Sequence, residues 1–180
     1  MIWFLSPKPK HADQVFAIYN VIVAQSRQPK FFADWEVPDT VTGRFDMISL
    51  HLCLVLRRLR SKDAATRAFS QKLFDLFFKD MDRSLREMGV SDVAVPKRIE
   101  KMGALFYGLL EAITQALSHG EMLELEKVIV KNIYSGESHT GGTALSAYLQ
   151  KQTERLDATE IDEILAGKLM FDDMTEGALV

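Results

Sequence analysis

Two aspartates, Asp80 and Asp82, lie two residues apart in a charge-rich stretch, and paired carboxylates of this kind can hold a divalent cation. On an α-helix, however, side chains two positions apart point about 200° away from each other, so this pair cannot chelate one ion. Asp75 and Asp82 also precede Lys79 and Arg86 by four residues, which is the spacing of helical ion pairs. The pattern therefore favours a solvated, salt-bridged helix face over a metal site.

Histidine and cysteine residues form no pattern typical of a nucleophile or a metal site. The single cysteine, Cys53, can form no internal disulfide, which predicts a reducing compartment. His51 lies two residues before it, on the opposite side of a predicted helix, so the two do not make a nucleophile and its base. Gly141 and Gly142 lack the lysine and the preceding strand of a phosphate loop. The four histidines are spread over separate elements: His11, His51, His119 and His139. We expect no catalytic residue, metal or cofactor.

The composition indicates a single globular domain. The chain has 180 residues, of which 47% are hydrophobic and 26% are charged, and its net charge is -3. This balance excludes a disordered chain and a bundle of membrane spans, and it provides no overall basic field that would favour DNA as a partner. The N-terminal MIWFLSPKPK has a short apolar start with no basic segment before it. We therefore expect neither a signal peptide nor a membrane span there, and we predict a cytoplasmic protein.

Apolar residues recur at three and four positions along most of the chain, without sustained period-two alternation. The predicted fold is all-α: a single-domain helical bundle of about six to seven helices over residues 11–167. An N-terminal extension, 1–10, precedes the domain, and a C-terminal tail, 168–180, follows it with Leu169 and Phe171 anchored. The predicted helices cover 11–28, 45–62, 68–88, 97–118, 121–134, 145–156 and 159–165.

Between the first two predicted helices, residues 29–43 read as a loop that carries three aromatic side chains. These rings could fill a satellite core or anchor a protein partner. If they are anchors, replacing Phe32 and Trp35 by alanine should weaken partner capture without unfolding the domain. The residues concerned are Phe31, Phe32 and Trp35, between Pro29 and Pro38.

Two further patterns each have two readings. On the helix at 97–118, small residues recur every four positions and would let another helix, of this chain or of a partner, approach closely. The basic run 57–62 complements a helix dipole, or it binds an anionic partner. Before 97–118, Gly89 is expected to cap a helix, and Val93 and Val95 to pin the connection to the core. The small residues are Ala104, Gly108, Ala112 and Ala116.

Two functions other than protein binding stay open at this point. A helical enzyme or ligand-binding protein acting on a lipid or prenyl substrate would use Asp75, Asp80 and Asp82 to hold magnesium and a diphosphate, although their spacing is poor for that. A peripheral ribosome or RNA binder would use Arg57, Arg58, Arg60 and Lys62, and its binding would depend strongly on salt.

Three long blocks occur in order and together resemble the ubiquinol-cytochrome c chaperone family. The blocks are YNVIVAQSRQPKFF, VPDTVTGRFDMISLHL and FDLFFKDMDRSLREMGVSDVAVPKRIEKMGALFYG. The similarity is strong from about Val15 to Ala116, and KNIY with SAYLQKQ continues it more weakly. One block alone would be weak, whereas three in order are specific.

This resemblance implies a non-enzymatic assembly chaperone that binds newly made cytochrome b and supports biogenesis of the cytochrome bc1 complex, respiratory complex III. It implies work at the membrane surface and, for the mitochondrial members, a small helical assembly partner and the ribosome. Because no presequence is recognisable, the chain is similar to a bacterial member, cytoplasmic and peripheral at the inner membrane.

The matching motif positions, together with the aromatic segment, are the residues that we expect to bind a partner. Arg44 and Asp46 can bind a partner's backbone or each other, and a purely structural role fits both residues at least as well. The full set is Gln25, Arg27, Pro29, Phe31, Phe32, Trp35, Pro38, Asp39, Arg44, Asp46, His51, Asp80, Asp82 and Arg86.

Overall fold

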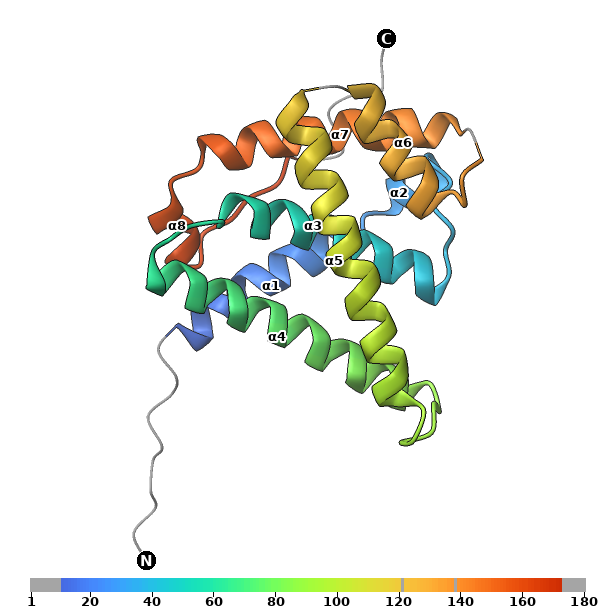
Figure 1. Cartoon of the computed structure of the whole chain (residues 1–180), viewed down its shortest axis with the longest axis horizontal. Coiled ribbons are helices and arrows are strands. Elements are labelled where there is room, and N and C mark those ends of the chain that lie inside the picture. The colour runs from blue at the N-terminus through green and yellow to red at the C-terminus, as the bar shows by residue number, and fades with distance from the viewer. Residues whose placement is uncertain (1–10, 121, 138, 173–180) are drawn as a thin grey trace, which may run out of the picture.

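The computed structural model describes residues 11–120, 122–137 and 139–172, and every regular element in these ranges is an α-helix (Figure 1). The prediction of an all-α single domain is confirmed, because one continuous core cluster draws residues from all eight helices. The helices are α1 (Ala12–Ser26), α2 (Pro29–Ala33), α3 (Val41–Arg58), α4 (Ala64–Glu87), α5 (Val95–His119), α6 (Met122–Ile133), α7 (Thr140–Ala158) and α8 (Ile161–Leu165).

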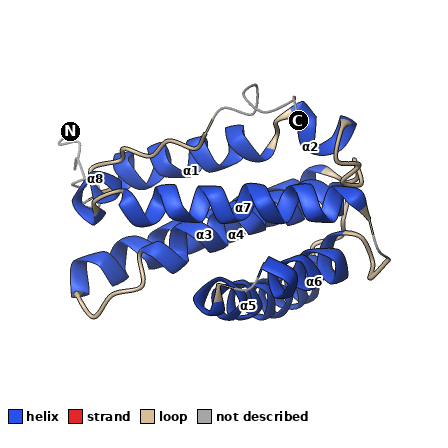
Figure 2. Ribbon diagram, turned by 90° about the horizontal axis from the view of Figure 1, so that it is seen from above, coloured by secondary structure: helices blue, strands red, loops and turns tan. Residues whose placement is uncertain are grey.

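Helix α3 lies at the centre of the domain because its middle has no solvent-facing side. All residues from Met47 to Val55 are buried, and a helix that is apolar nearly all round is stable only inside a protein. Helices α1, α5 and α7 contact it directly. Figure 2 shows α1 on one side of α3 and α7, and α5 with α6 on the other side.

Helices α4 and α5 form a hairpin whose closed end projects from the body of the domain (Figure 1). Gly89 follows α4 with a φ of 81°, which confirms the predicted left-handed cap. Val95 is fully buried, as expected, but Val93 is 90% exposed, so the prediction for Val93 is wrong. Val95 belongs to the first turn of α5, whereas Val93 lies in the turn before it.

The segment predicted as an aromatic loop, 29–43, contains α2 and the first residues of α3. Pro29 is the first residue of α2, a position where its fixed φ suits a helix and its missing N–H costs nothing. Thr40 caps α3 by accepting a hydrogen bond from the Gly43 N–H at 3.1 Å. Because α2 has only five residues, no periodic apolar pattern could mark it in the sequence.

The small residues of α5 do not pack beneath another helix along most of their length. Ala104 and Gly108 are exposed, and no neighbouring atom lies within 4 Å of the place where a Cβ on Gly108 would be. Only Ala116 is buried. The expectation of an internal neighbouring helix is therefore wrong for Ala104 and Gly108.

The start of the tail is anchored as expected, because Leu169 and Phe171 are both buried. The N-terminal extension, 1–10, and the rest of the tail, 173–180, lie outside the described residues. Within the described part of the chain, no helix is both long and apolar enough to cross a membrane. In the same residues, His, Cys, Asp and Glu side chains nowhere gather in a group of three that could hold a metal ion.

Candidate functional site

Two adjoining hollows lie along α4, the larger between α4 and α1 and the smaller between α4, α3 and α5. They share Arg27 and Asp80, and we call them together the α1/α4 groove. The smaller has a volume of about 170 Å³, and the larger of about 450 Å³. The smaller is lined by Arg27, Val41, Arg44, Phe45, Ile48, Asp80, Met81, Ser84, Leu85, Met88 and Met102. The larger is lined by Phe16, Tyr19, Asn20, Val23, Arg27, Leu76, Lys79, Asp80 and Arg83.

The groove brings together one predicted residue from each of the three sequence blocks. Arg27 follows the end of α1, Arg44 lies in the first turns of α3, and Asp80 lies on α4. They meet because α1 packs against both α3 and α4. The three positions are far apart in the sequence, so only tertiary packing makes them one surface.

Hydrogen bonds hold the Asp80 carboxylate at the junction of the two hollows. Tyr19 donates from its hydroxyl at 2.9 Å, and Arg83 donates from its guanidinium at 2.5 Å. Burial and the adjacent Asp80 raise the pKa of Tyr19, so the phenol keeps its proton and remains a donor. Asp80 is therefore held in one position at the junction, and the Arg83 guanidinium offsets its negative charge.

Apolar side chains of the groove remain exposed to solvent. Phe16 is 56% exposed, Val41 is 59% exposed and Met88 is 47% exposed. Met81 and Met102 also line the smaller hollow, and flexible methionines adapt to ligands of varied shape. Such a surface can take apolar side chains of a polypeptide, while Arg27, Arg44 and Asp80 set its orientation.

Other predicted residues form exposed ion pairs near the groove. Asp39 accepts a hydrogen bond from Arg44 at 2.7 Å, and this bond holds the pKa of Asp39 below its usual range. Asp82 accepts one from Arg86 at 2.6 Å, which confirms the predicted helical pair, and Arg86 also reaches Asp92. These pairs are exposed, so they fix side-chain positions more than they stabilise the fold.

The predicted acidic set of the prenyl-type alternative does not converge on one point. Asp75 accepts a hydrogen bond from the Gln71 amide, Asp80 is held by Tyr19 and Arg83, and Asp82 is held by Arg86. Each carboxylate therefore has its own partner along α4.

Gln25 and His51 lie in a buried polar cluster around Tyr148. The Tyr148 hydroxyl lies 2.8 Å from His51 Nε2, and Gln25 donates to that hydroxyl at 2.9 Å. His51 Nδ1 lies 2.8 Å from the Met47 carbonyl and 3.0 Å from Ser26 Oγ. Burial lowers the pKa of His51 to about 4, so the ring is neutral near pH 7. The cluster ties α1, α3 and α7 together in the interior.

Aromatic rings surround this cluster. They include the aromatic residues that were predicted to lie on a loop, and these rings pack against the interior. Phe31 packs edge-on against Trp35, His51 and Tyr148, with ring centroids 5.2 to 5.5 Å apart. Phe31 and His51 are fully buried, so the prediction that their side chains contact a partner is corrected. Phe32 and Trp35 are half-buried against the core, so their replacement by alanine would also cost packing energy.

Two tyrosines that we did not single out as site residues organise this region. Tyr148 closes the buried cluster, and the Tyr134 hydroxyl donates to the Trp35 carbonyl at 2.7 Å. Gly141 lies beside them, since a Cβ there would come within 2.0 Å of the Trp35 carbonyl oxygen. The sequence did carry a signal, because the weakly matching stretches KNIY and SAYLQKQ contain the two tyrosines.

The basic run 57–62 is partly used inside the domain. Arg57 makes a bidentate pair with Asp157, both bonds at 2.8 Å. Arg58 donates to the carbonyls of Leu156 and Thr159, which satisfies the C-terminal end of α7. Two of the four bases expected to bind RNA therefore hold α3 to α7.

Asp46 is half-buried on α3, and burial raises its pKa to about 7. In the described part of the chain this carboxylate has no hydrogen bond or ion pair, so neither Arg44 nor another base offsets its desolvation. The unfolded-state pKa is about 3.9, so the folded state binds the proton more tightly than the unfolded chain does. Stability is therefore lost as pH rises from about 4 to about 7.

We expect Asp46→Asn to stabilise the protein by about 2 kcal/mol at pH 8 and to leave stability unchanged near pH 4, since only the ionised carboxylate is penalised. Urea unfolding of both proteins at several pH values measures the difference. Asp82→Asn is the matched control, because the Arg86 bond lowers the pKa of Asp82 and its loss should not stabilise the protein at pH 8. A gain for Asp46→Asn that is independent of pH would contradict the assignment.

Comparison with known proteins places this all-helical fold in a family. The family model of the ubiquinol-cytochrome C chaperone matches residues 33–171, so the chain belongs to the ubiquinol-cytochrome c chaperone family. The resemblance inferred from the three sequence blocks is confirmed.

Two relatives extend this result. The chain is 19% identical over 162 residues to the ubiquinol-cytochrome-c reductase complex assembly factor 1 of Xenopus laevis, covering 88% of this chain and 80% of the relative. The crystal structure of the Cbp3 homolog from Brucella abortus superposes with a TM-score of 0.86 at 36% identity, covering 93% of both chains. Most of the chain is therefore shared with these relatives.

Proposed function

We propose that this protein is a non-catalytic chaperone in the assembly of the cytochrome bc1 complex, and that its client is newly made cytochrome b. Family membership supports the assembly role, since the Xenopus relative is named as an assembly factor of ubiquinol-cytochrome-c reductase. The observation that carries the client proposal is the α1/α4 groove, where Arg27, Arg44 and Asp80 from the three blocks meet beside exposed apolar side chains.

The chemistry of the groove suits a membrane protein that has not yet been assembled. Hydrophobic segments of such a client need temporary cover, and Val41, Met81 and Met88 offer an apolar, adaptable surface. The flanking segments of membrane helices carry charges, and Arg27 can pair with an acidic one. We propose that the protein works in the cytoplasm, peripherally at the inner membrane of a bacterium.

Affinity copurification tests this proposal. The tagged protein is isolated from gently solubilised native membranes and analysed by mass spectrometry, with an unrelated tagged protein of similar size as the control. We expect unassembled cytochrome b to be enriched, and the same sample reports a small helical assembly partner or ribosomal proteins. Absence of cytochrome b, together with a normal bc1 complex in a deletion strain, would refute the function.

A further inference from the structure

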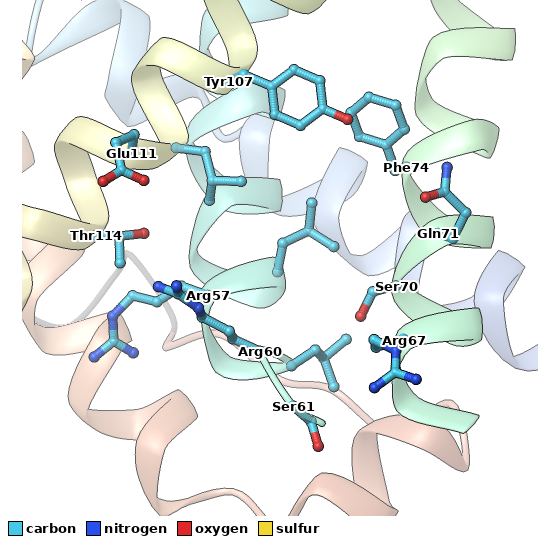
Figure 3. Close-up of a pocket in the computed structure, with 13 residues that line it drawn as sticks. Arg57, Arg60, Ser61, Arg67, Ser70, Gln71, Phe74, Tyr107, Glu111 and Thr114 are labelled. Carbon is cyan, nitrogen blue, oxygen red and sulfur yellow. The ribbon is translucent and has the colours of Figure 1, made fainter. Parts of the chain in front are cut away.

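A separate hollow of about 430 Å³ lies between the end of α3, the first half of α4 and the middle of α5 (Figure 3). We call it the α3/α4/α5 pocket. It opens because α4 and α5 are close at their hairpin end and diverge toward the start of α4 and the end of α5 (Figure 1). The α3/α4/α5 pocket shares no lining residue with the α1/α4 groove.

The lining of the α3/α4/α5 pocket is polarised from one end to the other. Figure 3 shows Phe74 and Tyr107 at one end and Arg57, Arg60 and Arg67 at the opposite end. The two rings lie 5.3 Å apart between centroids, and Tyr107 is 56% exposed. Three apolar side chains also line the pocket: Leu56, Leu59 and Leu110.

The basic end carries positive charge that carboxylates offset only in part. Asp63, which caps the start of α4, interacts electrostatically with Arg67, and this helps to lower the pKa of Asp63. Arg57 is paired with Asp157, whereas neither Arg60 nor Arg67 forms an ion pair with a carboxylate of the described residues. Arg67 donates to the Lys62 carbonyl, which leaves its positive charge in place. The one acid of the lining, Glu111, lies on the α5 side, where Gln115 donates to it at 2.7 Å.

We propose that the α3/α4/α5 pocket binds an acidic lipid, with its anionic head group at Arg60 and Arg67 and an alkyl chain along the leucines toward Phe74 and Tyr107. The volume lies in the range of about 300 to 1000 Å³ that is typical of small-ligand sites. Guanidinium groups bind phosphate and carboxylate oxygens through charge-assisted hydrogen bonds. The apolar wall would contribute affinity through burial of the chain.

The shape of the lining favours this ligand over two others. A free inorganic anion would use the arginines and leave the leucines and the aromatic end uncovered. An RNA segment would need a longer basic track, and Arg57 and Arg58 are already engaged with α7 and the residue after it. An acidic amphiphile uses both ends of the pocket.

Titration of the purified full-length protein with decyl phosphate tests the proposal. Decyl phosphocholine serves as a zwitterionic probe with the same chain, and inorganic phosphate serves as a head group without a chain. We expect decyl phosphate to bind about tenfold more tightly than decyl phosphocholine, and inorganic phosphate to bind more weakly than either. Calorimetry gives the affinities, and amide NMR shifts report whether Leu110 and Thr114 respond.

Variants connect the affinity to the pocket. Arg60→Gln with Arg67→Gln should remove the preference for the anionic probe, and Tyr107→Ser should weaken both decyl probes equally. The matched control is Lys97→Gln with Lys101→Gln, which removes the same charge from exposed α5 positions outside the pocket and should change nothing. Thermal melting of each variant verifies that it is folded.

Three results would overturn the proposal. Equal affinity for decyl phosphate and decyl phosphocholine would remove the role of the arginines. Equal affinity for inorganic phosphate and decyl phosphate would indicate a plain anion site. The basic end would be an RNA site if a short RNA binds, decyl phosphate does not displace it, and decyl phosphate does not shift the amide signal of Leu110. None of these results depends on cytochrome b.

Discussion

Gly43→Ala is expected to lower the free energy of unfolding by about 3 kcal/mol, the largest stability loss that we predict. A Cβ at this position would lie 1.9 Å from the Pro38 carbonyl oxygen and 3.0 Å from its carbonyl carbon. Both atoms belong to the backbone, so no side chain can rotate away to make room. The turn at Pro38 would have to move off α3, and the Thr40 cap on the Gly43 N–H would be lost with it.

Urea unfolding measures this loss of stability, and the control is an alanine substitution at a glycine that has free space around it. Gly108 lies within α5, and no neighbouring atom lies within 4 Å of the place that an alanine methyl group would occupy, so Gly108→Ala should instead stabilise the protein by about 0.5 to 1 kcal/mol. If the two substitutions change the free energy of unfolding in opposite directions, the contact with Pro38, rather than the loss of glycine flexibility, causes the destabilisation of Gly43→Ala. A loss below about 1 kcal/mol for Gly43→Ala would contradict the close packing.

Local patterns in the sequence were sufficient to predict every helix except the five-residue α2, and much of the core. Phe106, Leu109 and Ile113 recur at helical spacing on α5, and all three are buried as that spacing predicts. Gly89 follows the last turn of α4 and adopts the expected left-handed conformation. Such features depend on neighbours within one or two turns, so the sequence contains them directly.

The candidate site depends on contacts between distant segments, which no local pattern encodes. Gln25 and His51 were expected at a partner surface, but they meet Tyr148, which is 123 and 97 residues away; His51 is fully buried there and Gln25 is half-buried. Arg27 and Asp80 meet at the groove because α1 packs along α4. A polar residue in a shared motif can bind a partner or hold the fold together. Only its burial in the folded chain distinguishes these two roles.

Charges placed in the α1/α4 groove are expected to reduce capture of cytochrome b at least tenfold, which is the largest functional effect that we predict. This expectation rests on the proposed client. Val41→Asp and Met88→Asp each introduce a carboxylate at an exposed apolar position of the groove. A tenfold change in affinity corresponds to about 1.4 kcal/mol. Burying the new carboxylate against an apolar client segment would cost more than that.

The control substitution makes the same chemical change outside the groove. Val93→Asp alters a valine that is 90% exposed at the tip of the α4/α5 hairpin and lines neither hollow of the groove. All three side chains are exposed, so the variants should melt at the temperature of the parent protein, and differences in recovered cytochrome b then report the surface alone. If Val93→Asp abolished capture while Met88→Asp left it intact, the hairpin tip rather than the groove would hold the client.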